Sequence, residues 1–213
     1  MVRTGDPTVP GSTSRLMRRI SVVGSSGAGK TTLARALAAR LGLAHVELDS
    51  FYHQADWSHP STEAFRTSVE KALTDAEASH GGWTLCGDYE SQLEKLRELR
   101  SDTIVWVDLA KPLVMARLAR RTVRRALTRE ELWNGNREPL TNFYRWDPEA
   151  NVVRWSWTHF DERRLRFQSH IADGSWDHLR VVHLKTTRDA ENFLGSLSPP
   201  GSLGPPGSPG SAA

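Results

Sequence analysis

The fold is decided by the stretch Gly24-Ser25-Ser26-Gly27-Ala28-Gly29-Lys30-Thr31. It matches the phosphate-binding loop pattern, in which a glycine and four further residues precede glycine, lysine and serine or threonine. The β-branched run 19–23 before it predicts a buried strand, and the periodic run 31–41 after it predicts a helix that ends at Gly42. In such a unit, backbone N–H groups and the positive end of the helix bind phosphate groups. The sequence therefore predicts a site for a nucleoside triphosphate.

Two side chains of this loop have expected roles. Lys30 should lie between the β- and γ-phosphates of ATP, and the hydroxyl of Thr31 should ligate Mg²⁺. ATP and Mg²⁺ are thus the expected cofactors, and a glycine-rich turn that matches by chance is the alternative. The nucleotide contacts expected from this region are Gly24, Ser25, Ser26, Gly27, Ala28, Gly29, Lys30, Thr31 and Thr32.

Length and composition fit one α/β domain. The chain has 213 residues, of which 38% are apolar, which suffices for one substantial core but not for two full domains. Residues 1–15 and 196–213 are rich in small and turn-forming residues and are expected to be disordered. We expect a single folded domain over residues 16–195.

Charge and cysteine content narrow the class of protein. The net charge is +3, and arginines concentrate between Arg117 and Arg137, which indicates an anionic ligand more than a nucleic-acid surface and leaves both open. Cys86 is the only cysteine, which excludes an intrachain disulfide and a cysteine-based zinc site and favours a cytoplasmic location. No apolar run approaches the roughly 20 residues that span a bilayer, so no membrane contact is expected.

Strand and helix patterns alternate along the chain. This alternation is typical of an α/β fold in which helices cover both faces of a parallel sheet, giving three layers. Ligands of such sheets bind beyond the carboxyl ends of the strands, so Asp49, at the end of the second strand, should face the nucleotide. The five predicted strands cover residues 19–23, 44–48, 82–86, 102–109 and 179–184.

The segment Asp49-Ser50-Phe51-Tyr52 resembles the one that P-loop nucleoside kinases of the uridine kinase type carry at this place. In that family the aspartate lies beside the acceptor hydroxyl, so the resemblance implies that Asp49 is the catalytic base. A capping or turn aspartate is the alternative. The resemblance extends to an acceptor flap over about 50–80, with a helix over 61–79. Its aromatic residues either enclose a substrate or pack as core.

The stretch Gly82-Trp83-Thr84-Leu85-Cys86-Gly87-Asp88-Tyr89-Glu90 resembles the third strand of adenylate kinase-like bacterial proteins, often labelled DNA topology modulation proteins. Those proteins have aspartate where this chain has Cys86, and asparagine where it has Asp88. Their aspartate reaches Mg²⁺ through water, as a Walker B carboxylate does. The resemblance implies that Asp88 joins Thr31 at the metal. Cys86 itself, in a buried strand, is expected to be a small apolar filler. Asp108, which ends the fourth strand, is a second candidate.

An arginine-rich helix is predicted to begin at Lys111. Arg117, Arg121 and Arg124 recur at steps of three and four residues and so share one face. Kinases of this P-loop kinase-like fold place such a helix before a mobile lid, and its arginines bind the transferring phosphoryl group. The resemblance implies that Arg117 and Arg121 are catalytic phosphate contacts. A solvated basic face or a nucleic-acid contact is the alternative.

The lid is expected over about 126–150. Its string Trp133-Asn134-Gly135-Asn136-Arg137-Glu138 resembles the same adenylate kinase-like group, and Arg137 is expected to enter the site on closure. In these relatives the loop after the fifth strand lies over the adenine. That resemblance adds Thr187 to the nucleotide contacts, and Thr187 is also a candidate cap of the last helix.

Two functions from different classes follow. The first is a kinase that transfers the γ-phosphoryl group of ATP to a nucleoside, nucleotide or similar small acceptor, with Asp49 orienting the acceptor. The second is an ATP-binding regulatory protein that contacts nucleic acid and has little kinase activity; nucleic acid is the less favoured partner. The sequence leaves open the identity of the acceptor and whether the chain is a monomer or a homodimer.

Overall fold

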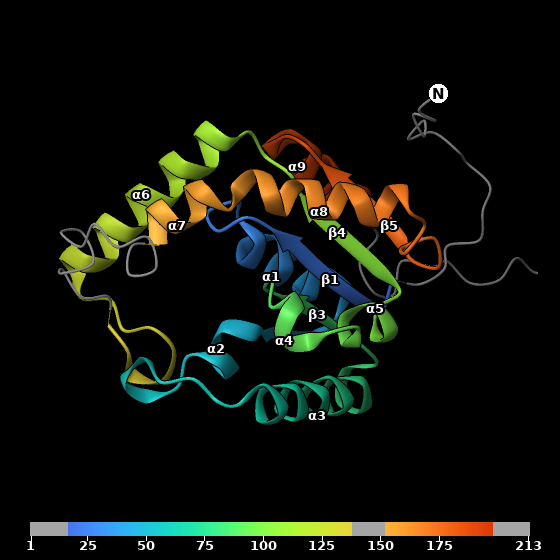
Figure 1. The fold of residues 1–213 in the computed structure, drawn as a ribbon. Helices are drawn as coiled ribbons and strands as arrows, with labels where there is room; N and C mark the ends of the chain where they lie inside the picture. The colour runs from blue at the N-terminus through green and yellow to red at the C-terminus, as the bar shows by residue number, and fades with distance from the viewer. Residues whose placement is uncertain (1–16, 138–151, 198–213) are drawn as a thin grey trace, which may run out of the picture.

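The computed structural model describes residues 17–137 and 152–197, in which a five-stranded parallel sheet is flanked by helices (Figure 1). The spatial order of the strands is β2-β3-β1-β4-β5, and every neighbouring pair is parallel. All carboxyl ends therefore lie along one edge, with the loop after β1 near its centre. The strands are β1 (Arg19–Gly24), β2 (Ala44–Glu47), β3 (Trp83–Cys86), β4 (Thr103–Val107) and β5 (Arg180–Leu184).

Helices connect the strands and supply both outer layers. The α-helices are α1 (Lys30–Leu41), α2 (Leu48–Tyr52), α3 (Thr62–His80), α4 (Glu90–Leu93), α5 (Leu96–Arg100), α6 (Lys111–Thr128), α7 (Val152–Thr158), α8 (Phe160–Ala172) and α9 (Thr187–Ser196). Two single 3₁₀ turns lie beside the site, η1 (Ala55–Trp57) and η2 (Trp133–Gly135). No helix within 17–137 or 152–197 has the length and apolar character needed to cross a membrane.

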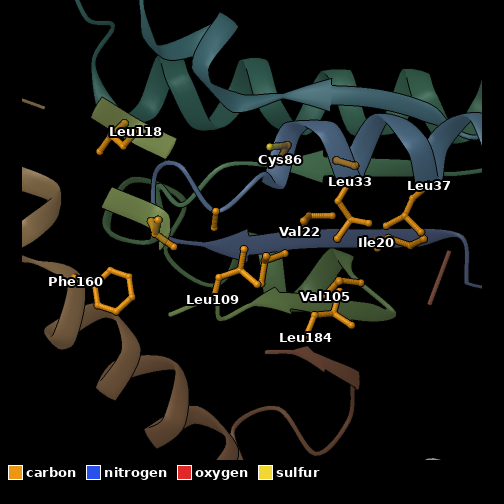
Figure 2. Close-up of a cluster of buried hydrophobic side chains, with 14 of the residues drawn as sticks. Ile20, Val22, Leu33, Leu37, Cys86, Val105, Leu109, Leu118, Phe160 and Leu184 are labelled. Carbon is orange, nitrogen blue, oxygen red and sulfur yellow. The ribbon is translucent and has the colours of Figure 1, made fainter. Parts of the chain in front are cut away.

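Alternate residues of the central strands face opposite layers. Ile20 and Val22 of β1 pack in one buried cluster with Leu33 and Leu37 of α1, and α9 borders the same cluster (Figure 2). Val23, on the opposite face of β1, packs in a second cluster with residues of β4 and α8. Because both faces are covered, β1 is a nearly continuous apolar run, as the sequence predicts.

A third cluster covers the β2 and β3 end of the sheet. Phe65, Val69 and Leu73 of α3 pack there against Trp83 and Leu85 of β3. The predicted helix over 61–79 is thus confirmed, and it begins at Thr62 because the Ser61 side chain accepts a hydrogen bond from the backbone N–H of Ala64. This packing fixes the flap helix against the strand that precedes Asp88.

Several element boundaries differ from the predictions. Leu48, assigned to the second strand, begins helix α2 instead, so Asp49 lies within a short helix. The helical segment between β3 and β4 is divided into α4 and α5 at Glu94, whose φ is 49°. The helical segment after the lid is divided into α7 and α8 after Thr158. The Thr158 hydroxyl donates to backbone carbonyls one turn earlier, a bond that bends helices. Of the predicted lid and tails, residues 138–150, 1–15 and 198–213 lie outside the described residues.

Candidate active site

The phosphate-binding loop connects β1 to α1 as predicted. Gly27 has a φ of 89°, and a Cβ there would lie 2.6 Å from the Val114 carbonyl oxygen of α6, so only glycine fits. Gly29 has a φ of 94° and precedes the first turn of α1, and no atom lies within 4 Å of the position that its Cβ would occupy. The start of α1 therefore borders open space, and Gly29, Lys30 and Thr31 line the cavity, as a phosphate site at a helix N-terminus requires.

Lys30 is the cation of this loop. Its ammonium group donates to the Ser25 carbonyl at 3.1 Å, and burial lowers the pKa of Lys30. Cys86, Asp88 and Asp49 act in the opposite direction, while the charge of Arg163 lowers the pKa further. A half-buried ammonium group whose pKa is lowered by desolvation gains from an anionic ligand, and this supports the predicted contact of Lys30 with the phosphates.

The Thr31 hydroxyl meets a carboxylate that the sequence analysis did not assign. Thr31 Oγ1 donates to Glu47 Oε1 at 3.3 Å and lies 3.4 Å from Cys86 Sγ. Burial raises the pKa of Cys86, so its thiol stays uncharged near neutral pH and cannot replace a carboxylate at the metal. Glu47, at the end of β2, lies where a carboxylate can order water on Mg²⁺. Thr31 and Glu47 both offer the oxygen donors that Mg²⁺ prefers.

The assignment of Asp88 to the metal is not supported by its surroundings. The Asp88 carboxylate contacts the guanidinium groups of Arg97, Arg163 and Arg166, and its side chain is 7% exposed. Three cations already neutralise it, so Mg²⁺ would have to displace at least one of them. Asp108 is likewise paired, with Arg164 at 3.1 Å and His183 at 2.9 Å.

Over the described part of the chain, no three or more His, Cys, Asp or Glu side chains converge as a metal site. Mg²⁺ bound to a nucleotide does not need such a cluster, because phosphate oxygens and water supply most of its ligands. The pair Thr31 and Glu47 therefore fits this metal.

Removal of the Glu47 charge should raise the Mg²⁺ concentration needed for half-maximal activity. For Glu47→Gln we expect a shift of about 10- to 100-fold, typical of the loss of a group that orders metal-bound water. The measurement is a magnesium titration of initial rates at fixed ATP. Asp88→Asn is the comparison variant. If the Mg²⁺ concentration for half-maximal activity rose in Asp88→Asn and not in Glu47→Gln, Asp88 and not Glu47 would be the metal carboxylate.

Asp49 lies at the cavity edge of α2. The Tyr89 hydroxyl donates to Asp49 Oδ1 at 2.7 Å and lies 3.4 Å from His53 Nε2. Burial and the Asp49 charge raise the pKa of Tyr89, which keeps its hydroxyl protonated as a donor. Burial lowers the pKa of His53, so this imidazole is neutral near pH 7. Tyr89 holds one carboxylate oxygen, and the other can accept from a substrate hydroxyl.

The arginines of α6 lie on the other side of the same cavity. Arg117, Arg121, Arg124 and Arg125 all line it. Arg117 of α6 donates to Thr187 Oγ1 of α9 at 3.0 Å. A hydrogen bond therefore connects two residues that the sequence predicts as contacts of the nucleotide. The capping role of Thr187 is wrong: Thr186 caps α9, in a capping box with Asp189.

One cavity of about 950 Å³ brings these groups together. Its walls include Gly24, Lys30, Thr31, Thr32, Glu47, Asp49, Arg117 and Arg121, together with Tyr52, Tyr89, Arg163 and Arg166. Tyr52 both lines the cavity and borders the α3 cluster. The flap aromatics therefore contribute to the cavity wall and to the core, the two alternatives left open by the sequence. The sequence analysis missed Glu47, Tyr89, Arg163 and Arg166. Of these, only Glu47 could have been predicted from the sequence, because it is an acidic residue at the carboxyl end of a predicted strand.

The flap and the beginning of the lid are joined by asparagines. Asn134 donates to the carbonyls of Ser50 and His53, and Asn136 donates to the carbonyl of Gln54 at 2.7 Å. The Asn136 side chain also accepts from the backbone N–H of Trp57 at 2.9 Å. Figure 1 shows the segment that follows α6 reaching the segment that follows α2. We call this contact the flap–lid junction.

Asn136→Ala should loosen the flap–lid junction. The Asn136 side chain is 4% exposed, and its loss removes its hydrogen bonds to the Gln54 carbonyl and the Trp57 N–H, which costs about 1 kcal/mol. We expect a lower melting temperature and a higher KM for the acceptor, measured by thermal denaturation and initial rates. Asn192→Ala, on the exposed face of α9, is the control. Equal behaviour of the two variants would show that the junction does not position the flap.

The fold and the site define the class as a P-loop protein that binds ATP with Mg²⁺. Residues 26–145 match the sequence model of the shikimate kinase family. The chain is also 31% identical over 132 residues to a shikimate kinase of Thermobifida fusca (strain YX), covering 52% of this chain and 76% of that protein. The chain therefore belongs to the shikimate kinase family, and it is an ATP-dependent phosphotransferase that acts on a small molecule.

Two solved structures are more distant. A shikimate kinase from Acinetobacter baumannii in complex with shikimate is 16% identical, covers 84% of this chain and 89% of its own, and has a TM-score of 0.48. An unliganded sugar kinase from Janibacter sp. HTCC2649 is 20% identical, covers 50% and 68%, and has a TM-score of 0.38. The family assignment is based on the sequence matches alone.

These comparisons refine the resemblances drawn from short motifs. They confirm a P-loop kinase, but not the narrower adenylate kinase-like group or the uridine kinase-like segment at Asp49. The alternative of a regulatory protein that contacts nucleic acid receives no support from them.

Proposed function

We propose that this enzyme transfers the γ-phosphoryl group of ATP to a hydroxyl of a small acceptor bound beside Asp49. The observation that carries the proposal is the shared cavity, in which the phosphate-binding loop and a carboxylate held by Tyr89 face the same space. A general base must lie within reach of the attacking hydroxyl, and the position of Asp49 in the cavity wall supports that role.

Each group of the chain has a distinct task in this mechanism. Lys30 and the N–H groups at the start of α1 bind the phosphates, while Arg117 and Arg121 neutralise charge that develops on the transferring group. Thr31 and Glu47 would hold Mg²⁺, which would supply positive charge to stabilise the phosphate groups during transfer. Asp49 accepts the proton of the acceptor hydroxyl and orients its oxygen for attack.

Thr187 is proposed as a nucleotide contact through Arg117, with which it shares a hydrogen bond. The proposed body of the enzyme is the single unit over about 16–195. We expect it to act in the cytoplasm as a monomer or homodimer.

The test is an acceptor-dependent release of ADP. The names of the matched relatives make shikimate the first acceptor to try, followed by nucleosides and small polyols. We expect at least one hydroxyl compound to raise ADP release above the rate with ATP alone, with an equal amount of phosphorylated product. ATP hydrolysis that no acceptor stimulates would contradict the proposal.

A further inference from the structure

His53 lies where the flap–lid junction meets the proposed catalytic base. It is the residue that ends helix α2, and its backbone N–H donates to the Asp49 carbonyl at 3.0 Å. Its own carbonyl accepts a hydrogen bond from the Asn134 side chain at 2.6 Å. The backbone of this one residue therefore connects the turn η2, which follows α6, to the short helix that carries Asp49.

The imidazole of His53 makes a second connection between the same two parts. The ring stacks on the indole of Trp133 in η2, with centroids 5.4 Å apart and an interplanar angle of 27°. His53 Nε2 lies 3.4 Å from the Tyr89 hydroxyl oxygen, and this hydroxyl donates to Asp49 at 2.7 Å. Because the Tyr89 proton points to a carboxylate, its oxygen is left to accept from His53 Nε2. A chain of contacts thus runs from Trp133 through His53 to the group that holds Asp49.

The groups that face this imidazole come from several elements. The rings of Tyr52, Trp57 and His59 lie with their centroids 5.4, 5.2 and 5.6 Å from that of His53. Burial lowers the pKa of His53; the Asp49 charge opposes this effect, and His59 adds to it. The titratable and charged neighbours are Asp49, Tyr52, His59, Tyr89 and, on the ring of Trp133, Arg125 of α6.

Protonation of His53 would weaken these contacts, because its second ring nitrogen has no acceptor. His53 Nδ1 is buried, and it has no hydrogen-bond partner within 17–137 or 152–197. In the neutral ring this atom carries a lone pair, whereas in the imidazolium it carries an N–H, and a buried N–H without a partner is costly. Since burial lowers the pKa of His53, the contribution of the neutral ring is complete above about pH 6.5 and is lost as the pH falls below it.

We infer that His53, in its neutral form, is a positioning residue that couples the flap–lid junction to the catalytic base Asp49. With the junction formed, the ring holds the Tyr89 hydroxyl on the carboxylate. When the ring is protonated or the junction opens, that hydroxyl can turn away and the carboxylate loses its fixed orientation. The inference rests on the proposed function, because it says how the base of that same site is oriented.

The first measurement needs no substrate. Histidine ring signals of the full chain labelled with ¹⁵N are followed by NMR from about pH 8 to about pH 5, and the His53 signal is identified by its loss in His53→Gln. We expect it to titrate below the ordinary histidine value of about 6.5 in the unaltered enzyme and in Asn192→Ala. In Asn136→Ala, which loosens the junction, the titration should move up towards that value, because opening hydrates the ring. The same midpoint in all three proteins would overturn the inference.

The second measurement records kcat over the same pH range, with magnesium, saturating ATP and the hydroxyl compound that most raises ADP release, shikimate being tried first. His53→Phe keeps a stacking ring but loses the hydrogen bond, whereas His53→Gln keeps a donor but cannot titrate. At neutral pH we expect kcat to fall about three- to tenfold in His53→Phe, the effect of one lost hydrogen bond, and to fall less in His53→Gln. The unaltered enzyme should lose activity at the midpoint of the His53 NMR titration, and neither variant should show that step.

Two other histidines provide the controls. His59→Gln removes the neighbouring imidazole of the flap, and His80→Gln removes an exposed one at the end of α3. Both variants should retain the step in kcat, since neither residue contacts Tyr89. An unchanged kcat in His53→Phe, or a step that survives both His53 substitutions, would overturn the inference and leave the proposed function standing. If no hydroxyl compound raises ADP release, the proposed function is contradicted, while a shift of the His53 titration in Asn136→Ala still supports the coupling.

Discussion

Lys30→Ala is expected to lower kcat by at least about a thousandfold. Lys30 is half-buried at the first residue of α1 and lines the cavity, where its charge lies beside the expected position of the phosphates. The transferring group gains charge on its outer oxygens, and a fixed cation stabilises that state more than the ground state. The measurement is acceptor-dependent ADP release at saturating ATP and magnesium.

The control for Lys30→Ala is Lys71→Ala. Lys71 lies on the exposed surface of α3 in an ion pair with Asp75, and its loss should leave kcat unchanged. A fold check by circular dichroism separates loss of chemistry from loss of structure. Full phosphotransfer by folded Lys30→Ala would refute the mechanism.

Asp49→Asn is expected to lower kcat by about a hundred- to ten-thousandfold, the usual contribution of a general base. Asparagine keeps the shape of the side chain and still accepts from the Tyr89 hydroxyl, but it cannot take the acceptor proton. The KM for ATP should change little, because Asp49 contacts the acceptor rather than the nucleotide. Initial rates over a range of both substrates measure the two parameters.

Asp56→Asn is the matched control for Asp49→Asn. Asp56 lies in the same flap but is exposed, and its left-handed backbone suits asparagine as well as aspartate. Tyr89→Phe should have an intermediate effect on kcat, because it removes the hydrogen bond that holds the Asp49 carboxylate but leaves the carboxylate in place. A ranking in which Asp56→Asn costs as much as Asp49→Asn would show that flap stability, not proton transfer, limits the rate.

The parts of the fold with strong local signals were predictable from the sequence. The loop from Gly24 to Thr31 has a fixed spacing, and β1 and α1 on either side have clear periodicity. The five parallel strands follow from the alternation of apolar runs with helices. The break between α4 and α5 at Glu94 was not predictable, because no glycine or proline marks it. Helix propensity does not predict a glutamate with a left-handed backbone conformation.

The site was only partly predictable, because ion pairing is a property of three dimensions. Asp88 has the right type and position in the chain for a metal carboxylate, yet α8 brings Arg163 to it from 75 residues further on. Glu47 was passed over because Asp49 follows it two residues later with a stronger motif. Asn136 contacts the Gln54 carbonyl across 82 residues, and no local pattern foretells such a partner.

The central claim is that a hydroxyl bound beside Asp49 receives the γ-phosphoryl group from ATP on the loop of Lys30. The most direct measurement is ³¹P NMR of the enzyme with magnesium, ATP and the hydroxyl compound that most raises ADP release. We predict a new phosphate monoester signal equal in amount to the ADP formed, absent with Lys30→Ala. ADP accompanied only by inorganic phosphate, or the monoester formed equally by Lys30→Ala, would contradict the claim.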